Sequence, residues 1–261
     1  MTAGLRGFRC LTRERVFKMV RQAASRIFRL MVILFMFIHL SCNDTKPEKN
    51  SDVQSERFNV RSVAKSDINQ MMDIYVAELR DQLRLLMDKL YKRNPRELSK
   101  SSFATAEENI QRLFSRTNNW FFRELNDVQG IEAMELSFDP EYSGDRVFAF
   151  VAGLTSMIMS SYKNKTDFYL YDNIDPQTLY NSARNIEIAA WKLSTASDVS
   201  GELLIYSNSM QDEEPNHSYA NLFGKMTELQ DTMAVMMANK TNRTISKIIQ
   251  RLATAVFLPI P

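Results

Sequence analysis

The stretch VFAFVAGLTSMIM, residues Val147–Met159, decides the fold, because it is the most apolar part of the chain beyond the N-terminal region. A bilayer-spanning helix needs about 20 apolar residues, so this stretch is too short to cross a membrane. It instead predicts a central helix that is buried on nearly every side. Gly153, Ser156 and Ser160 are small and would let another helix approach closely. A membrane-inserting hairpin is the alternative interpretation.

A long amphipathic helix is predicted upstream, between Ser66 and Pro95. Ser66 is a suitable N-cap residue, and Pro95 ends the pattern. Apolar residues recur there at alternating spacings of four and three, at Met72, Val76, Leu79, Leu83, Leu86 and Leu90. Such a seam occurs in coiled-coil dimers and in helices packed within their own bundle. Because Leu85 and Met87 widen the apolar stripe, the bundle is favoured.

Four further helical segments are predicted from apolar periodicity and helix-start signals. They cover residues 105–116, a turn or two around Ile131–Met134, residues 176–197 after Asp175 and Pro176, and a last region from Ser218. The last region is interrupted at 239–244 and is predicted to resume through Ile245, Ile248, Leu252 and Val256, before an apolar tail at 257–261 that should dock. The chain has only seven glycines, which favours a few long helices. The fold class is therefore all-α, an irregular bundle of about five to seven helices in a single domain, residues 61–261.

The N-terminal region resembles a secretory signal. Residues Leu30–Leu40 read LMVILFMFIHL, and eight basic residues and one acidic residue occur within 1–41. A positive segment followed by a short apolar run is typical of a signal peptide, which we assign to residues 1–41. Translation from Met19 would give an ordinary signal length, so residues 1–18 are interpreted as lying before the true start.

Cys42 follows the apolar run directly. The order Ser41-Cys42 resembles the lipobox of bacterial lipoproteins, in which a small residue precedes a cysteine that is diacylated and becomes the mature N-terminus. His39 and Leu40 depart from the usual lipobox, which has leucine and a small residue at those places. The resemblance implies lipidation at Cys42 and attachment to a membrane, with residues 42–60 as a flexible linker. The one other cysteine, Cys10, would be removed with the signal.

The resemblance also implies a place in the bacterial envelope. The sequence Asn43-Asp44-Thr45 lacks the aspartate directly after cysteine that retains enteric lipoproteins at the inner membrane, so the outer membrane, facing the periplasm, is favoured. The chain beyond residue 41 carries 25 basic and 30 acidic residues, a net charge of about −5. Nucleic acid is therefore not an expected partner, whereas the membrane and an envelope protein are. The sequence does not indicate an oligomeric state.

Catalytic signatures are scarce. Beyond the signal the chain has one histidine, His217, in a polar loop, and neither a nucleophile elbow nor a phosphate-binding loop. Acidic residues gather at 132–145 and at 172–175, without the spacing of an EF-hand. They are interpreted as a solvated face and helix caps, with a carboxylate-dependent hydrolase as a distant alternative. We predict no catalytic residue, no cofactor and no metal ion.

One segment is a candidate for ligand binding. In NSARNIEIAAWK, residues 181–192, Arg184, Glu187 and Trp191 would share one helix face, near Tyr171. These four residues could line a groove for a sugar or a peptide. The favoured interpretation is a surface ion pair between Arg184 and Glu187, with Trp191 at the edge of the core. The sequence thus favours a non-enzymatic envelope lipoprotein that acts as a scaffold or binds a partner. A helical protein that binds an apolar or glycan ligand is the alternative.

Overall fold

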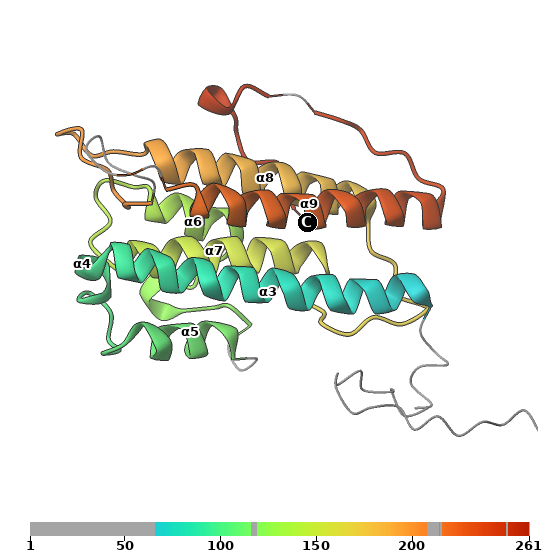
Figure 1. Ribbon diagram of the computed structural model, residues 1–261, viewed down its shortest axis with the longest axis horizontal. Helices are drawn as coiled ribbons and strands as arrows, with labels where there is room; N and C mark the ends of the chain where they lie inside the picture. Colours follow the sequence, from blue (N-terminus) through green and yellow to red (C-terminus); the bar gives the residue numbers. More distant parts are fainter. Residues whose placement is uncertain (1–65, 116–118, 208–213, 215, 249, 261) are drawn as a thin grey trace, which may run out of the picture. The chain divides into compact units, whose positions relative to one another are not determined.

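The computed structural model describes residues 66–115, 119–207, 214, 216–248 and 250–260. Within these residues the chain forms seven α-helices and no strand, which confirms the all-α class. The helices, labelled as in Figure 1, are α3 (Asp67–Arg93), α4 (Pro95–Leu98), α5 (Ala106–Phe114), α6 (Gly130–Ser137), α7 (Arg146–Ser161), α8 (Pro176–Thr195) and α9 (Ser218–Thr241). Short 3-10 helices cover Arg123–Leu125 and Leu252–Thr254.

Helix α7 is the centre of the bundle, as its apolar sequence predicts. All its residues except Ser160 are buried, and it packs against α3, α6 and α8. In Figure 1 it runs between α3 on one side and the α8–α9 pair on the other. Its N-terminus is capped by Asp145, whose Oδ1 accepts a hydrogen bond from the Phe148 N–H at 2.9 Å. None of the described helices is long and apolar enough to cross a bilayer.

Gly153 brings α6 and α7 into direct contact. A Cβ atom added at Gly153 would lie 2.5 Å from the backbone nitrogen of Met134 and 2.7 Å from the carbonyl oxygen of Gly130. Beside it, the Gly130 N–H donates to Ser156 Oγ at 2.8 Å. The close approach expected at these small residues of α7 is therefore present, with α6 as the partner helix.

Helix α3 packs inside its own bundle. The six residues of its predicted seam are at most 1% exposed, and the helix contacts α5, α7 and α9. Ser66 accepts the Asn69 N–H at the N-terminus, as expected. At the other end Asn94 exchanges hydrogen bonds with Tyr206, at 2.7 and 2.8 Å, which fixes the loop after α8 to the end of α3.

Helices α8 and α9 pack side by side and complete the bundle (Figure 1). Gln230 of α9 is fully buried, and its amide donates to Ser182 of α8 at 3.0 Å and to Ser161 of α7 at 3.3 Å. A buried polar group needs partners of this kind to offset its desolvation. The two hydrogen bonds of Gln230 fix the position of α9 against α7 and α8.

The prediction that a helix resumes at Ile245 is wrong. Asn242 adopts a left-handed conformation (φ 52°) and ends α9, and the described residues beyond it run back extended over α8, with one 3-10 turn (Figure 1). Side chains of α8 satisfy the backbone there: Gln177 bonds both backbone groups of Ser246, and Asn185 bonds both of Leu258. With these partners supplied, the segment needs no helical hydrogen bonds of its own. The apolar tail does dock, because Leu258 is buried.

Candidate functional site

A groove with a volume of about 720 Å³ lies between α8 and α9. Its walls come from one face of each helix, and Gln250 and Leu252 of the C-terminal segment close one side. Three of the residues proposed from sequence, Arg184, Glu187 and Trp191, line this groove together. Their spacing on α8 places them on one face, as the helical period requires.

The charged part of the groove is centred on Arg184. Its guanidinium forms ion pairs with Asp231 of α9 and with Glu187 of its own helix, the latter at 3.2 Å. The same group lies over the ring of Tyr180, 5.1 Å from its centre. Arg184 Nε is buried and has no hydrogen-bond partner among the described residues. The arginine is therefore held in place by three neighbours and keeps one unused donor.

Burial perturbs both carboxylates that face Arg184. It raises the pKa of Glu187 above its ordinary value, although the guanidinium acts in the opposite direction. Burial likewise raises the pKa of Asp231. Glu228 adds a third, exposed carboxylate to the lining. With three acids and one base, the groove carries a net negative charge, and a cation that entered it would oppose the effect of burial on the two pKa values.

The remaining lining is largely apolar and includes Trp191, Phe223 and Leu252. Gly224 lies at the groove in the interior of α9, and a Cβ atom added there would meet nothing within 4 Å. Gly224, Glu228 and Asp231 follow one another at i, i+4 and i+7, so one face of α9 supplies open space and two carboxylates. This spacing on α9, which the sequence-based predictions missed, is the counterpart of the shared face of Arg184, Glu187 and Trp191 on α8.

One residue of the predicted groove lies elsewhere. Tyr171 is in the loop after α7, is 81% exposed, and stacks on Tyr169 with ring centres 6.0 Å apart. It does not line the groove. Cys42, together with the whole predicted signal and linker, lies outside the described residues.

Three carboxylates of the two acidic segments have structural partners. Asp145 caps α7 and accepts the Tyr91 hydroxyl at 2.6 Å, and Asp172 pairs with Lys165. Asp175 accepts the Thr178 hydroxyl at the start of α8 and pairs with Arg243. In the part of the chain that the structure describes, no three histidine, cysteine or acidic side chains lie close enough to hold a metal ion.

No protein-family model, curated protein or solved structure matches the chain. The site must therefore be interpreted from its own chemistry.

Proposed function

We propose that this protein is a non-enzymatic, lipid-anchored component of the bacterial cell envelope that binds a partner protein through the groove between α8 and α9. The anchor rests on the apolar run Leu30–Leu40 and on Cys42, which resemble a lipoprotein signal. Two or three acyl chains hold a protein stably at a membrane, whereas one does so marginally. The sequence after Cys42 favours the outer membrane, with the helical body in the periplasm.

The observation that carries partner binding is the open space above Gly224. Glycine in the interior of a helix costs about 1 kcal/mol relative to alanine, and no neighbouring atom within 4 Å requires its absence of a side chain. The space belongs to a groove that also exposes Trp191, an aromatic residue of the kind enriched at binding surfaces. A side chain from a partner would fill this space.

The charges of the groove indicate which partner fits. Glu187, Glu228 and Asp231 outnumber Arg184, and the apolar side chains lie beside them. A basic segment that also carries an aromatic or aliphatic side chain would complement both parts. Its cation would compete with Arg184 for the carboxylates, and its apolar side chain would pack on Trp191 and Phe223.

Two substitutions of one residue test this proposal. Gly224→Ala and Gly224→Leu both improve helix propensity, but only leucine fills the groove. Random peptides displayed on phage would be selected on the full chain purified from membranes. We expect basic peptides with one large apolar residue, whose binding survives Gly224→Ala, is lost in Gly224→Leu, and weakens as salt is raised. Enrichment of no peptide, or equal binding by both variants, would contradict the proposal.

A small apolar or glycan ligand is the second candidate, because a volume of about 720 Å³ lies within the usual range of small-molecule pockets. A compound bound in the native groove raises the melting temperature of the protein with increasing concentration. Stabilisation by such a compound in the wild type and in Gly224→Ala, but not in Gly224→Leu, together with no selected peptide, would favour this candidate.

A further inference from the structure

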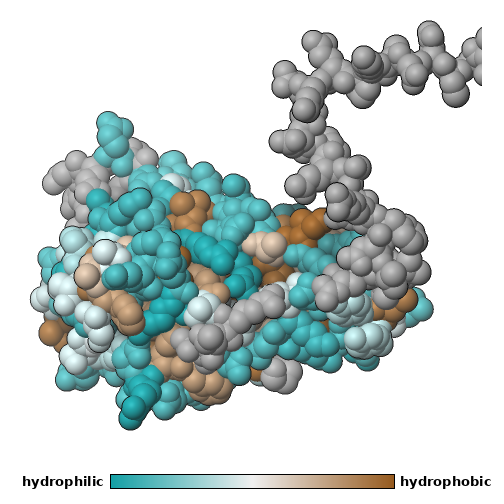
Figure 2. All heavy atoms as spheres, turned by 90° about the horizontal axis from the view of Figure 1, so that it is seen from below, coloured by the Kyte–Doolittle hydropathy of each residue, from teal (hydrophilic) through white to brown (hydrophobic). Residues whose placement is uncertain are grey.

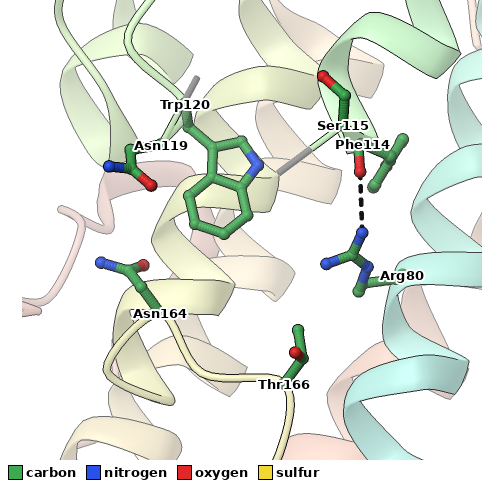
Figure 3. Close-up of a pocket in the computed structure, with 7 residues that line it drawn as sticks. All are labelled: Arg80, Phe114, Ser115, Asn119, Trp120, Asn164 and Thr166. Carbon is green, nitrogen blue, oxygen red and sulfur yellow. Dashed lines mark hydrogen bonds between the residues drawn. The ribbon is translucent and has the colours of Figure 1, made fainter. Parts of the chain in front are cut away.

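A second, smaller pocket lies away from the α8–α9 groove. It has a volume of about 190 Å³ and is lined by Arg80 of α3, Phe114 and Ser115 at the end of α5, Asn119 and Trp120, and Asn164 and Thr166 after α7. Figure 3 shows the Trp120 ring between the two asparagine side chains on one side and Arg80 on the other, with Thr166 below. Segments far apart in the sequence thus place one aromatic face among several polar groups.

The backbone on both sides of this pocket is unusual. Asn119 and Trp120 have φ angles of 44° and 60°, and Lys163 and Asn164 have φ angles of 55° and 57°. Asparagine tolerates this left-handed region, but a bulky residue such as tryptophan rarely adopts it. Such strain persists only where surrounding structure imposes it, and it gathers at ligand sites. Trp120, at one of these positions, lines the pocket (Figure 3).

The hydrogen-bonding groups of the pocket suit a neutral ligand with many hydroxyls. Among the described residues no carboxylate lines it, and its single cation, Arg80, donates to the Phe114 carbonyl at 3.0 Å. The side-chain amides of Asn119 and Asn164 each offer donors and an acceptor. Neither side chain makes a hydrogen bond with the described residues, although the Asn164 backbone N–H donates to the Met159 carbonyl. Adjacent hydroxyl groups on a ring both donate and accept, so they match a pair of amides.

We propose that this pocket binds a single neutral pyranose ring, as a free sugar or as one residue of a glycan. The apolar C–H face of the sugar packs on the indole ring of Trp120, which supplies a large flat apolar surface. Asn119 and Asn164 bind hydroxyl groups at one edge of the sugar. The small volume fits one ring and excludes an extended chain. The site is separate from the groove and does not depend on the proposed partner or on the lipid anchor.

The test follows the two tryptophan side-chain N–H signals of the isotope-labelled full chain by NMR. The chain contains only two tryptophans, so Trp191, in the other cavity, is an internal control. The probes are glucose, galactose and N-acetylglucosamine, with sorbitol as a matched polyol that lacks a ring face and uridine as a flat base. We expect the Trp120 signal to move with at least one of the three sugars, at a dissociation constant of about 1 mM. The Trp191 signal stays in place.

Variants at the two asparagines keep the test independent of folding. Asn119→Gly and Asn164→Gly remove each amide, and glycine adopts a left-handed backbone without strain. Each should raise the dissociation constant about tenfold, because a hydrogen-bonding partner of the sugar is lost. Absence of any shift with the three sugars, an equal shift with sorbitol, or undiminished binding by both glycine variants would overturn the proposal. A stronger response to uridine would also overturn it and assign the pocket to a base.

Discussion

Replacing Gly153 by alanine adds one methyl group where α6 and α7 are in contact. The new Cβ would lie 2.5 Å from the Met134 nitrogen and 2.7 Å from the Gly130 oxygen. Both are backbone atoms, which cannot rotate away as the end of a flexible side chain can, so α6 must move as a whole. Overpacking a core costs about 1–3 kcal/mol, and this contact belongs at the upper end of that range.

The same substitution also has a favourable effect, because alanine gains up to about 1 kcal/mol over glycine within a helix. The net change is a loss of about 2 kcal/mol in the free energy of unfolding. For a domain of about 150–250 residues, each kcal/mol shifts the melting temperature by about 2–4 °C. We therefore expect Gly153→Ala to melt about 4–8 °C below the wild type.

Gly224→Ala is the matched control, because it is the same chemical change in another helix. Its Cβ meets no atom within 4 Å, so only the gain in helix propensity remains, and the melting temperature should rise by about 2–4 °C. Thermal unfolding of both variants, followed by circular dichroism, gives the comparison. If Gly153→Ala melts at or above the wild-type temperature, the close approach of α6 to α7 is not a determinant of stability.

Two further changes test the buried polar groups. Burial raises the pKa of Asp145 to about 6 from an ordinary 3.8. Between about pH 4 and 6 the folded protein therefore binds a proton that the unfolded protein does not. This group makes the free energy of unfolding fall as pH rises through that window. Asp145→Asn should remove on the order of 3 kcal/mol of this pH dependence, as measured by urea unfolding at pH 4 and 7. If the variant and the wild type show the same difference in unfolding free energy between the two pH values, Asp145 does not have the raised pKa. Asn185→Ala leaves the buried N–H and C=O of Leu258 without their partner, so we expect a loss of about 2 kcal/mol and faster hydrogen exchange at Leu258. Exchange at the wild-type rate would show that the tail is held by other contacts.

The helices with strong periodicity could be predicted from the sequence. The apolar run at 147–159 and the seam between Met72 and Leu90 each fix which residues are buried, because a helix repeats every 3.6 residues. The N-caps at Ser66 and Asp145 act locally, so they can be predicted in the same way. The sequence singles out Ser66 as an N-cap, and it places Asp145 in an acidic segment interpreted as a solvated face and helix caps. Which helices pack around each one depends on the tertiary structure and cannot be predicted from local periodicity. The partner helix at Gly153 could be anticipated as a close neighbour but not identified as α6.

The three α8 residues Arg184, Glu187 and Trp191 of the candidate groove could be predicted, and the reason is local. Arg184, Glu187 and Trp191 share a face of α8 through their spacing alone. Asp231, the ion-pair partner of Arg184, is 47 positions away on another helix, and no local rule pairs the two. Tyr171 is close to α8 in sequence but lies in a loop, whose direction local patterns do not determine.

The helix predicted for the C-terminal segment is absent for a related reason. Its apolar spacing from Ile245 to Val256 fits a helix, yet Gln177 and Asn185 of α8 bond its backbone at two places. Tertiary hydrogen bonds thus override a local pattern.

The most direct test of the central claim is intact mass together with membrane fractionation of the native protein and of Cys42→Ala. We predict that the wild type begins at Cys42, carries the mass of acyl chains and sediments with membranes. The variant should lack the acyl mass and either remain unprocessed or become soluble, because without two or three chains the membrane attachment is lost. If the two proteins have the same processing and fractionate alike, Cys42 is not lipidated, and the proposed envelope anchor and location are wrong.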